Sequence, residues 1–233
     1  MSEGAPARPV RLRVELHAHT NASPDSRLRP ATIIRVCQAR GIEALAITDH
    51  NTMDGAFAVA AAAPFPIILG DEIKSRAGDI IGLFLKGPVP RDLSPRETVH
   101  AIKAQGGLVL VPHPFDSLRR SALGLAAVES IVDGIDILEV FNGRTIRAAD
   151  NAAARHYAER HGLAQSVGSD SHLLAEIGVS WQRMRPWSDP ADFLLSLRDA
   201  ELHMRHAPAW VHLGSSFHAY ATKFEKRLRR WFG

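Results

Sequence analysis

The chain has 233 residues, of which 45% are hydrophobic and 23% are charged, and its formal net charge is +3. This length fits one domain, and the balance of residues excludes a disordered or fibrous protein. The single cysteine, Cys37, excludes an intramolecular disulfide framework, and no apolar run is long enough to span a bilayer. Because no signal-peptide pattern opens the sequence, we expect a cytoplasmic protein.

Apolar runs with the pattern of strands alternate along the chain with segments of helical pattern. Strands are predicted at 12–16, 43–48, 66–70, 80–85, 108–111, 136–141 and 164–168. Helices are predicted between Pro30 and Gly41, in the alanines before Pro64, after the capping box of Ser94 and Glu97, and at 122–131 and 145–160. Repeated strand-then-helix units predict a parallel sheet, and seven of them in this length favour an α/β fold with a closed or nearly closed barrel.

The two ends of the chain differ from this pattern. We expect a flexible N-terminus at 1–9, a barrel domain at 10–206, and a basic amphipathic helix packed on the barrel at 207–233. The predicted helix carries an apolar stripe of Phe217, Tyr220, Phe224, Leu228 and Trp231. Its basic residues leave a membrane-surface or nucleic-acid contact as alternatives to simple packing.

Histidines and carboxylates follow the predicted strands. In a β/α barrel the functional side chains lie at the C-terminal ends of the strands, so these residues should meet. They are His17, His19, Asp25, Asp49, His50, Asp71, Glu72, Asp79, His113, Asp170 and His172. Any one of them has an ordinary explanation as a helix cap or a surface residue, but together they would repel or stay unpaired without a cation.

The types of residue in this set indicate the metal. Imidazole and carboxylate without cysteine suit zinc, manganese or iron better than a thiolate-rich structural zinc site. About eight candidate ligands are too many for one tetrahedral ion, so we predict two or three divalent ions that share carboxylates. Such sites serve hydrolysis.

Six ordered motifs, HAHT, SPDS, AITDHNT, GDEIK, PHPFD and GSDSH, resemble the signature motifs of the PHP family, the polymerase and histidinol phosphatase domain. The resemblance covers roughly residues 11–177. It implies a single-domain, distorted (β/α)7 TIM-like barrel with a trinuclear metal site that hydrolyses phosphoesters. It also implies the metal ligands His17, His19, Asp25, His50, Glu72, His113, Asp170 and His172, with Glu72 and Asp170 as bridging or shared carboxylates.

The chain departs from the pattern of this family at two positions. Many members begin with Asp-Leu-His where this chain has Glu15, and many carry histidine where Asp79 stands. We predict that Asp79 is also a ligand, since a carboxylate replaces imidazole readily around manganese or iron; otherwise the third ion is weaker or absent. Glu15 and Asp49 are interpreted as acceptors for the second ring N–H of ligating histidines.

Three residues are predicted to act in catalysis: Asp49, Arg144 and Arg119. A metal-activated hydroxide would attack phosphorus while basic side chains hold the non-bridging oxygens. Arg144 is the best candidate for that role because it lies just beyond a predicted strand end, followed by Arg119, with Arg120 and Lys74 as alternatives. The general acid stays open among a ligand-like histidine, Asp49 and metal-bound water.

These observations predict a metal-dependent phosphoesterase that hydrolyses phosphomonoesters or nucleotide and oligonucleotide phosphates. One alternative is an amidohydrolase-like enzyme that cleaves C–N bonds, which shares a His-x-His after the first strand. Another is a non-catalytic metal-binding regulatory domain. Cys37 lies on an apolar helical stripe and is predicted to be a buried structural thiol rather than a nucleophile.

Overall fold

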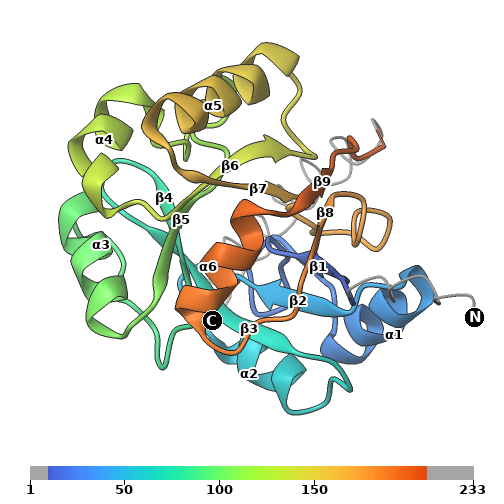
Figure 1. Ribbon diagram of the computed structural model, residues 1–233. Coiled ribbons are helices and arrows are strands. Elements are labelled where there is room, and N and C mark those ends of the chain that lie inside the picture. Colours follow the sequence, from blue (N-terminus) through green and yellow to red (C-terminus); the bar gives the residue numbers. More distant parts are fainter. Residues whose placement is uncertain (1–9, 209–233) are drawn as a thin grey trace, which may run out of the picture.

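The computed structural model describes residues 10–208, and within them nine strands form one sheet in the order β7-β6-β5-β4-β3-β2-β1-β8-β9. The strands are β1 (Leu12–Glu15), β2 (Ala44–Ile47), β3 (Ile67–Lys74), β4 (Asp79–Leu83), β5 (Leu108–Val111), β6 (Ile137–Asn142), β7 (Ala164–Gly168), β8 (Trp181–Met184) and β9 (Glu201–His203). The helices are α1 (Pro30–Arg40), α2 (Asp54–Ala60), α3 (Pro95–Ala104), α4 (Gly124–Ile131), α5 (Ala148–His161) and α6 (Pro190–Arg198), with a 3₁₀ turn, η1 (Val132–Gly134). Figure 1 shows the helices around the outside of the sheet.

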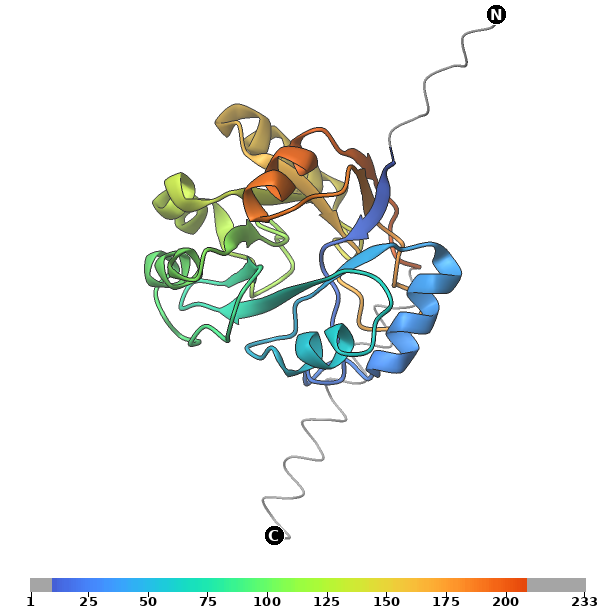
Figure 2. The ribbon, with the colours of Figure 1, turned by 60° about the horizontal axis from the view of Figure 1, so that its bottom comes forward.

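The sheet curls into a nearly closed barrel, as the sequence predicts, and its first and seventh strands meet at one end. There, Ala18 and Ser171 form an isolated parallel bridge, and His19 N donates to Ser171 O at 3.0 Å. Further along, β8 and β9 fill the gap, and the Gln182 side chain accepts from Val167 N and donates to Val14 O. Figure 2 shows β1 beside these C-terminal strands. The seven predicted strands are present, but β8 and β9 were not predicted.

Two strands, β4 and β8, run against the others, and β8 does so because it pairs antiparallel with β1. β3 pairs antiparallel with β4, and β4 pairs antiparallel with β5, so the prediction of an all-parallel sheet is wrong at β4. The reason is the short connection, in which Ser75 Oγ donates to Gly78 O at 2.6 Å and closes a tight turn instead of a helical crossover. Because β4 starts where β3 ends, its first residue, Asp79, lies at the same end of the barrel as the carboxyl ends of the parallel strands.

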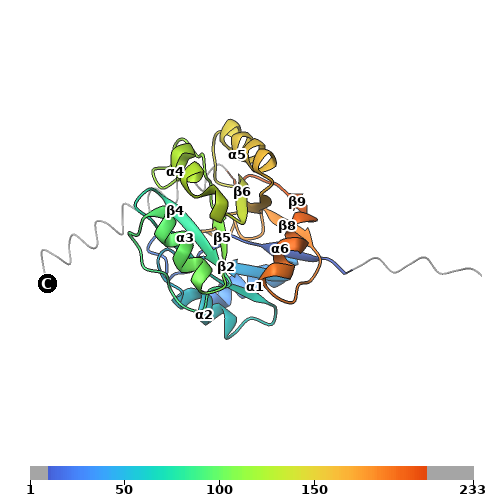
Figure 3. The same ribbon diagram turned by 60° about the vertical axis from the view of Figure 1, so that its left-hand side comes forward.

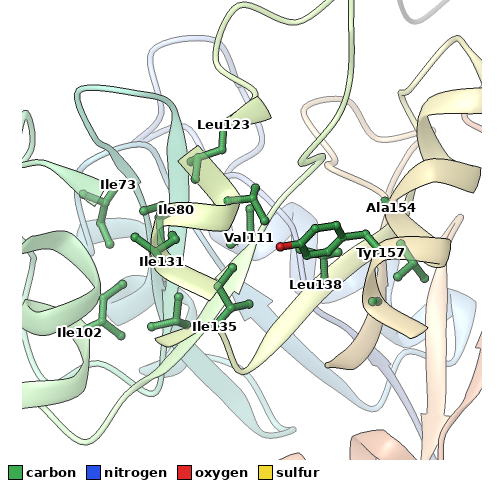
Figure 4. Close-up of a cluster of buried hydrophobic side chains, with 14 of the residues drawn as sticks. Ile73, Ile80, Ile102, Val111, Leu123, Ile131, Ile135, Leu138, Ala154 and Tyr157 are labelled. Atoms are coloured by element: carbon green, nitrogen blue, oxygen red, sulfur yellow. The ribbon is translucent and has the colours of Figure 1, made fainter. Parts of the chain in front are cut away.

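The helices cover the outer face of the barrel. α2 packs on β2 and β3, α3 on β4 and β5, and α5 on β6 and β7 (Figure 3). Between strands and helices lies a buried cluster that includes Ile80 of β4, Val111 of β5, Ile102 of α3, Ile131 of α4 and Tyr157 of α5 (Figure 4). Burial of these side chains is the main stabilising term for this face.

A second cluster occupies one end of the barrel. Val14, Leu110 and Ile137 contribute strand side chains to it, and α6 adds the buried Phe193 and Leu197. In Figure 1, α6 lies across the strands at this end. The opposite end, where β1, β2, β3, β5 and β7 finish, is left to polar side chains.

Several local signals in the sequence have the predicted structure. Ser94 and Glu97 form the capping box at the start of α3, with Ser94 N donating to Glu97 Oε2 at 2.8 Å. Gly41 and Gly162 end α1 and α5 in the left-handed conformation, at φ values of 65° and 62°. Cys37 is buried on α1, and this burial raises the pKa of its thiol, as expected of a structural residue.

Of the two predicted end segments, 1–9 and all but the first two residues of 207–233 lie outside the described residues. Within 10–208, none of the helices has the length and apolarity needed to cross a membrane.

The two hydrogen bonds by which the Gln182 side chain closes the barrel can be tested by substitution. Replacing Gln182 with Ala removes one acceptor for Val167 N–H and one donor to Val14 O, both buried. We expect the free energy of unfolding to fall by about 1–3 kcal/mol, measured by urea denaturation. The matched control is Gln165→Ala on β7, where the side chain is half-exposed. Equal stability of the two variants would contradict the role of Gln182.

Candidate metal centre

The candidate ligands lie at the end of the barrel where β1 and β7 meet. His17 and His19 follow β1, and Ala18 between them bridges to Ser171. This bridge keeps the chain extended, so both imidazoles face the same side. Their side chains are fully buried.

Glu72 is at the centre of the site. It is 1% exposed, and four imidazoles surround its carboxylate. Oε2 lies 3.4 Å from His17 Nε2, 3.3 Å from His19 Nε2 and 3.2 Å from His50 Nδ1, and Oε1 lies 3.2 Å from His113 Nε2. Burial alone would raise the pKa of Glu72, but the facing histidines outweigh it and hold that pKa well below its usual range. The carboxylate is therefore ionised and suited to shared coordination.

Asp170 faces the same histidines from the end of β7. Its Oδ1 lies 3.5 Å from His17 Nε2 and 3.4 Å from His19 Nε2, and its Oδ2 lies 2.8 Å from Arg119 Nη1. Burial would raise the pKa of Asp170, but Arg119 and the histidines hold it well below its usual range. Its contacts with two histidines are compatible with a shared carboxylate, a role that stays a prediction for Asp170 as for Glu72.

A third carboxylate closes the open side. Asp25 Oδ2 lies 3.4 Å from His50 Nε2 and 3.3 Å from His172 Nε2. The Asp25 side chain is 37% exposed and that of His50 is 23% exposed, so the site opens to solvent here.

The ligand atoms fall into overlapping groups. In each group, the atoms lie within 4.8 Å of one another. The groups are His17, His19 and Glu72; His17, His113 and Asp170; Glu72, Asp79 and His113; and His19, His50 and His172. Together with the contacts of Asp25, they bring all nine predicted ligands into one cluster; the ligand roles themselves stay predictions.

Two observations indicate that the cluster can hold divalent metal ions. Nitrogen–oxygen separations of 3.2 to 3.5 Å around Glu72 and Asp170 are long for hydrogen bonds, yet they match the edge of about 3.4 Å expected between ligands on one tetrahedral zinc ion. In addition, His19 Nε2 and Asp170 Oδ1 are buried without a hydrogen-bond partner in the described structure. Burial and the neighbouring His172 and His50 lower the pKa of His19 to about 3, so its imidazole is in the neutral, metal-binding form.

Two ligand positions have a strained backbone. His113 has a φ of 32° and Asp170 a φ of 53°, both in the left-handed region that residues other than glycine rarely adopt. Such conformations persist where the surroundings enforce them, and they concentrate at functional sites.

Glu139 contacts two candidate ligands, His17 and His113, and was not predicted from the sequence. This buried carboxylate lies 3.0 Å from His17 Nδ1 and accepts from His113 N at 2.7 Å and from Asn142 Nδ2 at 2.9 Å. Glycine is required at position 168, because a Cβ there would collide with Glu139 Oε1. The available signal was one carboxylate between the apolar residues of a fully buried strand, β6, which ends with Asn142.

Arg144 lies beside the candidate ligand His172, and its contact with a phosphoryl oxygen stays a prediction. Its Nε lies 3.3 Å from Glu176 Oε1 and its Nη1 lies 2.7 Å from His172 Nδ1, and its side chain is 10% exposed. The other oxygen of Glu176 accepts from His172 N and Leu173 N at 2.9 and 2.8 Å. Arg144 and Glu176 therefore fix the loop that carries His172.

Asp49 and Glu15 differ from their predicted contacts. Asp49 accepts from Thr20 N at 2.7 Å, from Thr20 Oγ1 at 2.8 Å and from Ser23 Oγ at 2.7 Å, and Ser23 Oγ lies 3.2 Å from His19 Nδ1. Asp49 thus reaches His19 only through Ser23, and as a fully buried group it is badly placed to protonate a leaving group. Glu15 accepts from Ser169 and from Gly178 N and touches no histidine ring; burial raises its pKa to about 8.

Among the predicted basic residues, Arg119 contacts the candidate ligand Asp170, whereas Arg144 contacts the candidate ligand His172. The Arg119 side chain is 24% exposed, and its Nη1 lies 2.8 Å from Asp170 Oδ2. Lys74 and Arg120 are exposed, and neither side chain makes a hydrogen bond or ion pair with the cluster among the described residues, although the backbone of Lys74 pairs with Asp79.

Comparison with known proteins decides the family. The PHP domain matches residues 15–110, and the PHP-associated region matches residues 148–202. A relative from Methanocaldococcus jannaschii, the uncharacterized protein MJ1587, is 36% identical over 144 residues, which cover 56% of this chain and 84% of that protein. The chain belongs to the PHP domain family. It is accordingly a hydrolase of the phosphoesterase class.

Solved structures share the PHP fold. One is a two-domain protein from Bacteroides vulgatus that contains a predicted PHP-like metal-dependent phosphoesterase, with a TM-score of 0.66 at 18% identity, covering 84% of this chain and 65% of that one. Another is the lesion-specific endonuclease Q of Pyrococcus furiosus, with a TM-score of 0.62 at 14% identity, covering 83% of this chain and 58% of that one. The chain therefore spans less than two thirds of either protein.

The hydrogen bonds of Glu139 give a test of this PHP site. We expect Glu139→Gln to weaken metal binding by about 10–100-fold, because Gln lacks the charge that orients His17 and raises its basicity. Competition with a chromogenic chelator measures the affinity. The control, Glu159→Gln, changes an exposed carboxylate on α5. Unchanged affinity in the Glu139 variant would rule out the supporting role.

Proposed function

We propose that this PHP protein hydrolyses phosphomonoesters or nucleotide and oligonucleotide phosphates at a site of two or three divalent metal ions. The observation that carries the proposal is the ring of four imidazoles around Glu72, extended by Asp170 on one side and by Asp79 on the other. Residues 10–206 form the proposed domain.

The overlapping groups suggest how the ions would be shared. His17, His19 and Glu72 would hold one ion, with Asp170 in reach. Glu72 would also belong to a second set with Asp79 and His113. A third set would consist of His50, His172 and Asp25, which meet at the open side. Manganese, zinc and iron suit these nitrogen and oxygen ligands.

When bound, such ions lower the pKa of water toward neutrality and neutralise charge on the phosphoryl group. The protein supplies the positioning. Arg119 is held by Asp170 at 2.8 Å and by Asp116 at 3.6 Å, which leaves other guanidinium N–H groups to bind a phosphoryl oxygen. Glu139 and the Arg144–Glu176 pair keep His17 and His172 in place.

The kind of phosphoester is the finer part of the proposal. Endonuclease Q, whose fold is similar, has a structure with a 27-mer duplex substrate, which supports nucleic acid as one candidate. The amidohydrolase-like and non-catalytic alternatives keep the same site but predict C–N cleavage or metal binding without turnover.

A direct assay tests the proposal. Manganese-reconstituted protein is given a chromogenic phosphomonoester, a chromogenic phosphodiester and short oligonucleotides. We expect turnover on at least one of them, and a His17→Ala, His19→Ala double variant should lose more than the roughly 10–100-fold typical of outer-shell changes. Absence of turnover on all three, with metal content confirmed, would favour the alternatives.

Asp79 gives a test of the number of ions. We expect Asp79→Ala to hold one ion fewer per chain than the parent protein, while Asp79→His restores it, because either carboxylate or imidazole can complete the set with Glu72 and His113. Metal content after gel filtration, measured by inductively coupled plasma mass spectrometry, checks this. Identical metal content in the Ala variant would exclude Asp79 as a ligand.

A further inference from the structure

A cavity of about 440 Å³ lies between the loop that follows β5 and the second half of α5. Its wall includes Phe115 and Arg119 from the loop, Leu125 from α4, and Ala153 and Tyr157 from α5. The volume lies within the roughly 300–1,000 Å³ of small-molecule sites. The roles described above for the candidate metal ligands, and for the residues that hydrogen-bond to them, do not explain why this cavity is present.

The cavity adjoins the metal centre. Pro114 lines it and directly follows His113, a candidate ligand. Arg119 also lines it, and the same side chain lies 2.8 Å from Asp170 Oδ2. Arg119 therefore lines the cavity and also contacts the metal centre, and a ligand that reached from the metal centre into the cavity would pass this side chain.

The lining is aromatic and apolar. Phe115 and Tyr157 pack edge to face, with ring centroids 5.4 Å apart and an interplanar angle of 70°. Figure 4 shows that the ring of Tyr157 belongs to the buried cluster, which fixes this side of the cavity. Leu125, which also lines the cavity, is 57% exposed and adds an apolar surface to the lining. A flat apolar ligand would cover it.

The charged groups of the lining are the guanidinium groups of Arg119 and Arg160 and the carboxylate of Asp116. Asp116 lines the cavity, but its oxygens already contact Leu118 N at 3.1 Å, Thr145 Oγ1 at 3.2 Å and Arg119 at 3.6 Å. On α5, His156 and Arg160 reach the cavity from exposed positions, and no carboxylate of the described residues lies within ion-pair distance of either. A negative substituent on the ligand would complement them.

We propose that this cavity binds the leaving group of the substrate, and that this group is an aromatic ring that carries a negative charge. The inference rests on the proposed phosphoesterase function and names the substrate class. An aromatic ring fits because it can pack against Phe115 with the geometry that aromatic pairs prefer. Arg160 supplies the charge that selects the anionic substituent.

Binding of non-hydrolysable phosphonates to the manganese-loaded protein, measured by calorimetry, tests the inference. Methylphosphonate occupies the metal centre alone, phenylphosphonate adds a ring, and 4-phosphonobenzoate adds a ring and a carboxylate. We expect about tenfold tighter binding of phenylphosphonate than of methylphosphonate, and a further gain for 4-phosphonobenzoate. The gain from the carboxylate should disappear in Arg160→Gln, with phenylphosphonate unaffected.

A filled cavity provides the matched comparison. Ala153→Trp should abolish the advantage of both aryl phosphonates and leave methylphosphonate binding unchanged. Ala152→Trp is the control, because Ala152 is the preceding exposed residue of α5 and does not line this cavity. Thermal melting confirms that both variants fold. A nucleoside 5′-phosphonate that binds more tightly than 4-phosphonobenzoate, and loses this advantage in Ala153→Trp, would assign the ring to a nucleobase rather than a simple aryl group.

The outcomes separate the two proposals. If methylphosphonate binds but phenylphosphonate binds no tighter, or if Ala153→Trp and Ala152→Trp behave alike, the leaving-group cavity is overturned while the metal centre stands. If no phosphonate binds to protein with confirmed metal content, the proposed function itself fails.

Discussion

The structure depends on the need to neutralise a cluster of buried carboxylates and imidazoles. Glu72 is almost fully buried, and four imidazole nitrogens lie within 3.2 to 3.4 Å of its oxygens. Ionised groups are costly to bury unless they are paired or coordinate a cation. The barrel meets this need because it brings strand ends from the whole chain together at one point. The apolar clusters pack around that point and toward the opposite end of the barrel.

The sequence predicted this convergence because strand ends are recognisable in it. His17, His50 and Asp170 each follow an apolar run, and parallel strands in a barrel finish at the same end. Asp79 reached the correct end for a different reason: it opens a strand that runs in the reverse direction. The reversal was hidden because apolar content does not encode strand direction.

The parts that were missed depend on tertiary contacts. β8 and β9 are only four and three residues long. Burial alternates along both, but a polar residue, Gln182, takes a buried position of β8 and β9 is mostly exposed, so no apolar alternation marks them. Glu139 is 122 residues from its partner His17, so no local pattern links them. Glu176 comes four residues after His172, but its contact with His172 N depends on how the intervening loop folds. Likewise, Arg144 lies at a strand end as predicted, yet Glu176 determines where its guanidinium points.

The left-handed backbone of His113 and Asp170 has a consequence for folding. Holding these residues at φ values of 32° and 53° costs free energy of order 1–3 kcal/mol each, and interactions elsewhere must offset it. A cation bound only by the native state would contribute about 2.7 kcal/mol at a free concentration one hundred times its dissociation constant. The folded fraction of the protein would then follow the free metal concentration around it, so metal supply would govern the abundance of the protein as well as its activity.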